Sequence, residues 1–159
     1  MKISLICVGK LKESFFREGC EEYLKRLQSY AKVEVIELPD EAAPNNPSQK
    51  QIEAIQNKEG EKILAKLPSS AYVVAFDGRG KTMDSPSFAS FMEKGLALGG
   101  SHLVFIIGGS FGLNDEVRNK ANHLLSFGPM TYPHNLARLI ALEQIYRSFK
   151  ILKNEPYHK

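Results

Sequence analysis

Apolar runs alternate with amphipathic segments from one end of the chain to the other. Five runs have the composition of β-strands: Ile3–Val8, Val33–Leu38, Tyr72–Phe76, His102–Ile107 and a short one at His123–Ser126. The first is almost continuously apolar, which is typical of a strand covered on both faces in a parallel sheet. The second alternates apolar and acidic residues, which indicates a half-exposed strand nearer an edge. The pattern therefore predicts that the first strand is central.

Apolar residues at helical spacing predict five helices between and after these strands. They cover about Glu13–Tyr30, Ser48–Lys66, Ser85–Leu98, Asp115–Ala121 and Pro133–Leu152. Residues Ser48, Ser85 and Asn114 are of the types that cap helix N-termini, Gly60 is a weak point in the second helix, and Gly99 ends the third. Because strands alternate with helices, we expect an α/β fold with a mostly parallel sheet flanked by helices. The length suits one domain, residues 1–159.

Charge is distributed unevenly along the chain. The segment Arg138–Lys159 contains five basic and two acidic residues. Residues 1–137 contain 16 basic and 16 acidic residues, so the whole net charge of +3 lies in the last segment. A basic end of this kind indicates a polyanionic partner.

Cysteine usage and hydropathy point to the cytosol. Cys7 and Cys20 are widely spaced, so neither a zinc knuckle nor a redox pair is expected, and both are interpreted as buried free thiols. The opening apolar stretch is too short for a secretory signal, and no run approaches the roughly 20 residues of a membrane span.

Three loops follow strands at what should be one edge of the sheet: Phe76–Lys81, Gly108–Gly112 and Phe127–Tyr132. In open α/β sheets, ligands bind at the carboxyl ends of the strands, so we expect these loops to converge. Glycines would let a ligand approach the backbone of the second loop, and the third could enclose a flat heterocycle. Purely structural turns would explain both loops as well.

The segment Gly108–Gly112 also matches G-x-S-x-G, the nucleophile motif of α/β-hydrolases, with Ser110 at its centre. A serine, acid and histidine triad would need an acid on a later strand end. The candidate acids that follow, Asp115, Glu143 and Glu155, lie in or after helices, so a small serine hydrolase is the weaker alternative.

The remaining polar residues allow few other sites. His102 and His123 flank strands without companion ligands, so we interpret them as structural or exposed, and we expect no metal site. Glu143 and Arg147 are four apart in the last helix and are interpreted as a solvated ion pair.

Several segments together resemble a known enzyme family. They are Phe105–Gly109, Met130–Arg138, Glu143–Arg147 and Pro156–His158, with the Met1–Lys12 opening and the chain length in agreement. On these residues the chain resembles the ribosomal RNA large-subunit methyltransferase H family of the SPOUT class. Two positions depart from the usual pattern: Ser110-Phe111 replaces a small and an acidic residue, and Phe76 stands where leucine is common. We therefore assign no role to an acidic side chain in the glycine loop.

The resemblance implies a homodimeric enzyme that moves a methyl group from S-adenosylmethionine to N3 of a pseudouridine in helix 69 of 23S rRNA. Its substrate would be the assembled ribosome, and its fold would contain a deep trefoil knot formed by the last segment. Position by position, the resemblance places cofactor contacts on Phe76, Gly108, Phe127, Gly128, Pro129, Met130, Thr131 and Tyr132.

The acceptor nitrogen must lose a proton, so a base is needed. Our candidates are His134 and His158, with Tyr157 and Arg138 to orient the ring or to stabilise charge on its carbonyls. In the family's dimer the tail would reach the partner's cofactor loops. Phosphates of the rRNA are assigned to Arg147, Lys150, Lys153 and Lys159. A ribosome- or RNA-binding factor without a cofactor is the main rival from another class.

Overall fold

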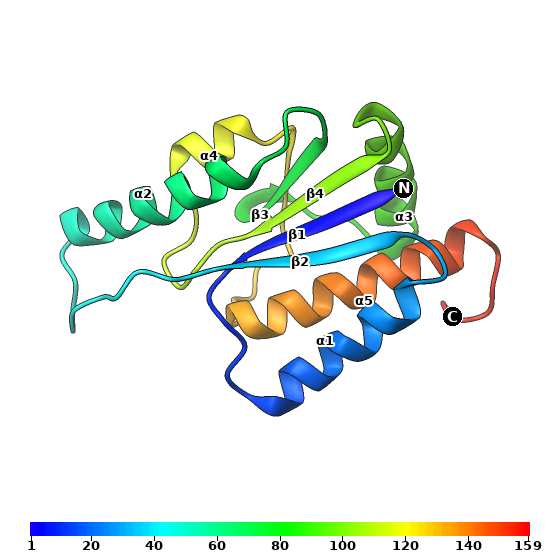
Figure 1. The fold of residues 1–159 in the computed structure, drawn as a ribbon, viewed down its shortest axis with the longest axis horizontal. Helices are drawn as coiled ribbons and strands as arrows, with labels where there is room; N and C mark the ends of the chain where they lie inside the picture. Colours follow the sequence, from blue (N-terminus) through cyan, green and yellow to red (C-terminus); the bar gives the residue numbers. More distant parts are fainter.

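The computed structural model describes all 159 residues and contains one five-stranded sheet. Its strands are β1 (Lys2–Val8), β2 (Lys32–Leu38), β3 (Tyr72–Lys81), β4 (His102–Ile107) and β5 (His123–Leu125). They lie in the order β2-β1-β4-β3-β5, and every pair is parallel. The predicted α/β fold is confirmed, with β1 inside the sheet and β2 at its edge (Figure 1).

Five helices cover the sheet on both faces. They are α1 (Ser14–Leu27), α2 (Gln49–Lys66), α3 (Ser85–Leu98), α4 (Asp115–Lys120) and α5 (His134–Leu152). Helices α1, α3 and α5 pack on one face, and α2 and α4 pack on the other. Each helix begins and ends within a few residues of its predicted bounds.

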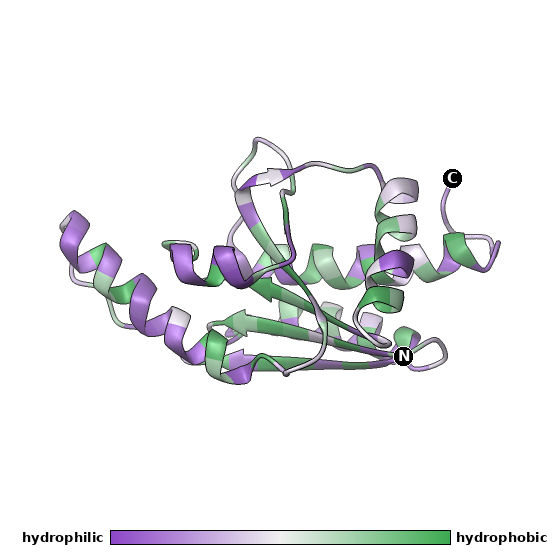
Figure 2. Ribbon diagram, turned by 90° about the horizontal axis from the view of Figure 1, so that it is seen from above, coloured by the Kyte–Doolittle hydropathy of each residue, from purple (hydrophilic) through white to green (hydrophobic).

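The alternation of side chains along the strands produces a core on each face. On β1, Leu5 packs with the α1, α3 and α5 side, and its neighbour Ile6 packs with α2 and α4. Phe105 and Ile106 on β4 divide in the same way, and all four side chains are fully buried. Figure 2 shows the central strands as hydrophobic and most of α2 as hydrophilic. Burial on both faces is what the continuous apolar pattern of β1 predicts.

The predicted end of β3 at Phe76 is wrong, because the strand continues to Lys81. After an irregularity that follows Phe76, Lys81 pairs with Leu125 of β5, and its carbonyl accepts a hydrogen bond from the Ser126 amide. Gly80 permits this pairing, since a Cβ there would lie 2.6 Å from the backbone of Leu124. The Asp-Gly-Arg-Gly composition suggests a turn, but pairing with β5 holds the segment extended.

Two smaller predictions about helices are also wrong. The N-cap of α3 is Asp84, whose carboxylate accepts a hydrogen bond from the Ser87 amide at 2.8 Å, and Ser85 is already inside the helix. Helix α2 is not interrupted at Gly60, where a Cβ would lie 2.6 Å from Nδ2 of Asn114. Ser48 and Asn114 cap their helices as predicted.

The three segments selected from the sequence are the second half of β3 and the loops that follow β4 and β5. The trefoil knot is not a consequence of strand order and stays a prediction. None of the helices combines the length and the apolar character that a membrane crossing requires.

Candidate functional site

A cleft of about 570 Å³ opens where the three loops meet. Its lining comes from the second half of β3, from the end of β4 and the loop after it, from the segment after β5 and from the first turn of α5. The lining residues are Phe76 to Gly78, Ile107 to Ser110, Gly112, Ser126 to Gly128, Met130 to His134 and Ala137. The predicted convergence of the loops is therefore confirmed. Of the eight residues expected to contact a cofactor, all except Pro129 line this cleft.

Aromatic rings form one wall of the cleft. The rings of Phe76 and Phe127 are stacked, with centroids 4.2 Å apart and planes 4° from parallel. Tyr132 meets Phe127 edge-on at 6.4 Å. The stacked pair also borders a second cavity of about 740 Å³, which lies between the start of α3 and the middle of α5. A planar ring in the cleft would find an apolar surface of the right shape.

The glycine loop presents unused backbone amides to the cleft. The Gly112 amide donates to the Gly109 carbonyl at 3.0 Å, and Gly112 has a φ of +78°, which favours glycine. Gln56 of α2 donates to the Phe111 carbonyl at 2.7 Å and holds the loop from behind. Gly109 and Gly112 pair in an isolated antiparallel bridge, and the amides of Ser110 and Phe111 donate to no protein acceptor. Such amides can bind a polar or anionic group of a ligand.

The third loop is held in place at one point and open beyond it. Ser126 Oγ accepts from the Gly128 amide at 3.1 Å and donates to the Gly128 carbonyl at 3.2 Å. Gly128 has a φ of +114°, which an L side chain would strain. Met130, Thr131 and Tyr132 are exposed at the rim. The exposed rim residues are available to close over a ligand.

Neither lysine nor arginine lines the cleft, and its titratable side chains are Asp77, Tyr132 and His134. Asp77 is 8% exposed and forms an ion pair with Arg118, whose Nε lies 2.8 Å from the carboxylate. A ligand with several phosphates would find no cation to balance its charge. The cleft therefore suits a neutral or cationic ligand better than a nucleotide phosphate.

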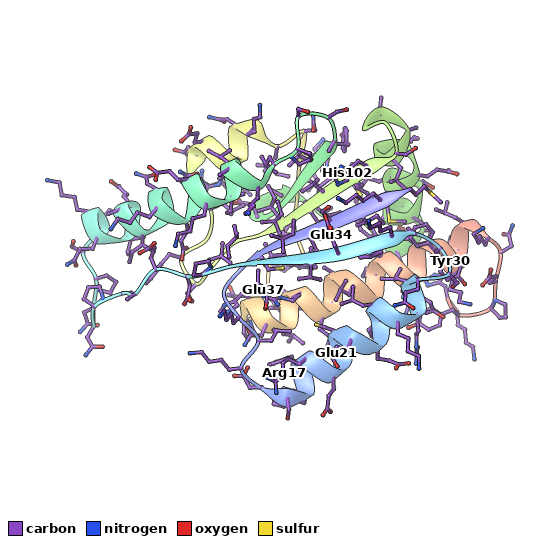
Figure 3. All side chains as sticks on the ribbon, viewed as in Figure 1. Arg17, Glu21, Tyr30, Glu34, Glu37 and His102 are labelled. Atoms are coloured by element: carbon purple, nitrogen blue, oxygen red, sulfur yellow. The ribbon has the colours of Figure 1, made fainter.

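Two catalytic candidates at the start of α5 lie in different environments. His134 lines the cleft, and its ring packs on Gly9, where a Cβ would lie 3.0 Å from Nε2. Arg138 is 2% exposed and does not line the cleft. Its Nη2 donates to the Gly9 carbonyl at 2.8 Å, and its Nη1 donates to Glu37, which lies over the first turns of α5 (Figure 3). In this chain Arg138 joins α5 to the ends of β1 and β2.

The other two catalytic candidates belong to a tail that folds back on α5. Tyr157 donates a hydrogen bond to Glu143 at 3.0 Å, and Arg147 lies 3.2 Å from Nδ1 of His158. Burial, followed by hydrogen bonds to Tyr23 and Glu143, raises the pKa of Tyr157, so its phenol stays protonated. His158 borders the second cavity, not the cleft.

Arg147 and Glu143 are not the solvated pair expected from the sequence, because their side chains are only 24% and 19% exposed. The guanidinium of Arg147 also lies over the Tyr157 ring, 4.7 Å from its centroid. Together with Tyr157 and His158, this pair fixes the tail.

The four residues assigned to rRNA phosphates fall into two groups. Arg147 and Lys150 are engaged within the chain, Lys150 with Glu155 at 2.7 Å. Hydrogen bonds from Lys150 and Tyr30 lower the pKa of Glu155, so the pair is ionised near neutral pH. Lys153 and Lys159 are exposed and form no ion pair.

The two thiols and the two histidines next to strands lie outside the cleft, in structural surroundings. Cys7 and Cys20 are buried free thiols. His102 lies 2.9 Å from the hydroxyl of Ser4, and His123 packs against the ring of Phe91. Ser110 is exposed and makes no hydrogen bond with an acid or a histidine, so the structure holds no hydrolase triad around it. No group of three or more metal-ligating side chains is present.

Sequence reasoning missed Glu59, a 3% exposed carboxyl on α2 directly behind Gly109. A signal was present, because Glu59 stands between Ile55 and Ile63 at the four-residue spacing of a buried stripe. A charged residue in such a stripe is rarely buried without a partner.

Comparison with known proteins gives full-length matches. The family described as "Predicted SPOUT methyltransferase" matches residues 1–158. Proteins named "Ribosomal RNA large subunit methyltransferase H" from Carboxydothermus hydrogenoformans, Enterococcus faecalis and Bacillus pumilus are 54%, 50% and 49% identical over 159 residues. Each match covers 100% of both chains.

Among solved structures, a probable methylase family protein from Haemophilus influenzae Rd KW20 is similar in fold, with a TM-score of 0.50 at 16% identity. The similarity covers 99% of this chain and 70% of that one, and it supports the fold alone. The sequence matches are far stronger, and they agree with the motifs recognised around the cleft. The chain therefore belongs to the SPOUT methyltransferase family and, within it, to the ribosomal RNA large subunit methyltransferase H group.

Proposed function

We propose that this protein transfers the methyl group of S-adenosylmethionine to N3 of a pseudouridine in helix 69 of 23S rRNA, on the assembled ribosome. The family membership and the names of its full-length relatives support this function. The observation that carries it is the cleft, in which backbone groups from three strand ends face a stacked aromatic pair.

The chemistry of the cleft fits this methyl donor. The stacked Phe76 and Phe127 offer a surface to an adenine ring, and the free amides of the glycine loop can bind ribose or carboxylate oxygens. The absence of lysine and arginine from the lining disfavours phosphate-bearing cofactors and is compatible with a sulfonium cation. The donor, when bound, supplies an electrophilic methyl group.

Positioning is then the main task of the protein. A methyl transfer in one displacement is fast when the acceptor nitrogen is held within about 3 to 3.5 Å of the methyl carbon, in line with the bond that breaks. The rim residues Met130, Thr131 and Tyr132 are placed to hold donor and acceptor together. Removing the proton from N3 requires a base within hydrogen-bonding distance.

His134 is the candidate base within the cleft of the same chain. His158 is the second candidate, and Arg147 orients its ring through Nδ1. Tyr157 serves as a hydrogen-bond donor because its pKa is raised. Arg138 has a positioning role, because it holds the Gly9 carbonyl beside His134.

A homodimer working on the ribosome completes the proposal. Phe15 on α1 is 64% exposed, which leaves an apolar side chain for a second copy to cover. Of the four residues assigned to phosphates, Lys153 and Lys159 form no ion pair, and Arg147 and Lys150 would add to them if the tail rearranged on binding. Two chains double this basic surface, which favours a preformed, shaped RNA in the cytoplasm over naked RNA.

Methyl transfer from labelled S-adenosylmethionine to ribosomes tests the proposal. The wild-type protein should label 23S rRNA within intact ribosomes and leave protein-stripped rRNA nearly unlabelled. Equal labelling of stripped rRNA would contradict the need for an assembled substrate. A protein that labels neither and shows no donor uptake in calorimetry would instead be the cofactor-free RNA-binding factor.

The tail is tested in the same assay. A chain ending at Asn154 loses Tyr157 and His158, so methylation should disappear while donor affinity stays near the wild-type value. The variant His158→Ala should reproduce much of that loss, and Lys159→Ala serves as a control that changes salt dependence more than rate. Unchanged activity of the shortened chain would remove the tail from the mechanism.

A further inference from the structure

A buried carboxyl lies immediately behind the glycine loop. Glu59 is 3% exposed, and a Cβ on Gly109 would lie 2.8 Å from its Oε1 and 3.2 Å from its Oε2. The carboxyl of Glu59 therefore occupies the space that a side chain at residue 109 would need. Gly109 lines the cleft, so only the backbone of the loop separates this carboxyl from a bound ligand.

Only one of the two carboxyl oxygens is satisfied. Oε2 accepts a hydrogen bond from the Glu41 amide at 3.0 Å, and Oε1 is buried with no hydrogen-bond partner. Buried polar atoms without partners are rare in proteins because they lose their hydration and gain nothing in exchange. An arrangement of this kind suggests that the missing interaction arrives with a ligand.

The charges around Glu59 do not supply that interaction. Asp40 and Glu41 face it from the segment after β2, and Lys62 lies on its own helix but pairs with Glu41 at 2.7 Å. Val8 of β1 also lies beside the Gly109 position and is uncharged, and the glycine loop contributes no charged side chain. Burial, with the nearby Asp40, raises the pKa of Glu59, although the Glu41 amide and Lys62 oppose that change. The protonated form is favoured while no positive charge is near.

Resting on the proposed function, we propose that Glu59 is a specificity-determining counter-charge, which makes the cleft prefer the cationic sulfonium donor over its neutral demethylated product. The donor and the product share the adenosine, the carboxylate and the ammonium group, and they differ in the charge on sulfur. A negative charge across a thin, buried backbone segment interacts with that difference, because the low local dielectric screens it little. Product release is favoured in the same step, since methyl transfer removes the positive charge.

Proton linkage follows from the same arrangement. A cation in the cleft stabilises the ionised carboxyl, so Glu59 gives up its proton to solvent when the donor binds. Affinity for the donor should therefore rise with pH until Glu59 is ionised in the free protein, and then become constant. Affinity for the neutral product should depend on pH much less. His134 also lines this cleft, so the contribution of Glu59 is measured as the difference between the wild type and the Glu59 variant.

Calorimetry on the full-length protein tests this inference. S-adenosylmethionine and S-adenosylhomocysteine are titrated into wild type, Glu59→Gln and Glu61→Gln, each in two mildly acidic buffers of different ionisation enthalpy. We expect Glu59→Gln to lower the preference for the cationic ligand roughly tenfold and to remove the proton release, with the neutral ligand almost unaffected. Glu61 is exposed on the same helix, so Glu61→Gln should behave as wild type.

Two results with the Glu59→Gln variant would overturn the inference. The first is a wild-type ratio of the two affinities. The second is an equal loss of both affinities, which would make Glu59 only a structural support of the loop. Infrared difference spectra of the wild-type protein provide a measurement that needs no variant. Adding the sulfonium ligand should remove a protonated-carboxyl band, and an unchanged band would contradict the inference. Wild-type protein that binds neither nucleoside would refute the proposed function itself, which distinguishes the two failures.

Discussion

Replacing Arg138 with methionine removes a buried guanidinium that ties three elements together. Its side chain is 2% exposed, its Nη2 donates to the Gly9 carbonyl at 2.8 Å, and its Nη1 donates to Glu37 of β2. Methionine keeps most of the apolar volume, so the change removes charge and hydrogen bonds without opening a large cavity. Stability should fall because both acceptors lose their donor.

The size of this loss of stability depends on how exposed the two acceptors are. Removing one partner of a buried ion pair costs about 3 to 5 kcal/mol when the remaining charge stays buried. The Glu37 side chain is 38% exposed and can recover part of its hydration, and Nε of Arg138 already lacks a partner in the wild type. We therefore expect Arg138→Met to lower the free energy of unfolding by about 2 to 3 kcal/mol. The unsatisfied Gly9 carbonyl accounts for roughly 1 kcal/mol or more of this loss.

Urea and thermal unfolding at one fixed protein concentration measure this loss, since a dimer would make stability depend on concentration. A loss of that size corresponds to a decrease in Tm of roughly 4 to 12 °C for a chain of this length. The control is Arg26→Met, because the ion pair between Arg26 and Glu22 is exposed and its loss should change stability little. If Arg138→Met unfolds like the wild type yet loses methylation, the positioning role is wrong and a direct catalytic role is favoured.

Three further predictions concern the cleft wall, the extended strand and the thiols. Phe127→Ala removes half of a stacked pair, so donor affinity should fall about 3- to 10-fold in calorimetry, whereas Leu98→Ala, at a 74% exposed residue, should leave it unchanged. Gly80→Ala places a Cβ 2.6 Å from the backbone of β5 and should lower the free energy of unfolding, measured in urea, by about 2 kcal/mol or more. The control Gly78→Ala meets nothing within 4 Å and should change that free energy little. Equal stability of the two alanine variants would contradict the observed pairing. Burial raises the pKa of Cys7 to about 12, so at pH 8 about one molecule in ten thousand carries the Cys7 thiolate. An aromatic disulfide reagent should therefore react with Cys7 only after unfolding. Rapid reaction of the native protein would show that Cys7 is accessible.

The sequence predicts the fold well because the strongest signals are local. The continuous apolar run of β1 and the capping residues Ser48 and Asn114 each determine one element without help from distant parts of the chain. The exception is the end of β3, where Asp77-Gly78 is typical of a turn. The pairing of Lys81 with Leu125 decides the conformation there, and a contact over more than 40 residues leaves no local signal.

The convergence of three segments at one cleft could be predicted for a different reason. Parallel strands run in one direction, so the loops after β4 and β5 and the second half of β3 lie toward the same edge of the sheet. The surroundings of Arg138 and Glu59 could not be predicted in the same way. Arg138 meets Gly9 from 129 residues away, and the burial of Glu59 depends on how α2 packs over the glycine loop. Such contacts are set by tertiary packing alone.

The central claim is that backbone groups from three strand ends hold the methyl donor. Amide chemical shifts of the isotope-labelled protein, recorded as S-adenosylmethionine is added, test it most directly. The account predicts saturable changes at Phe76, across Gly108–Gly112 and from Phe127 to Tyr132, with the exposed face of α2 unaffected. Changes confined to another surface, or none at saturating donor, would contradict it.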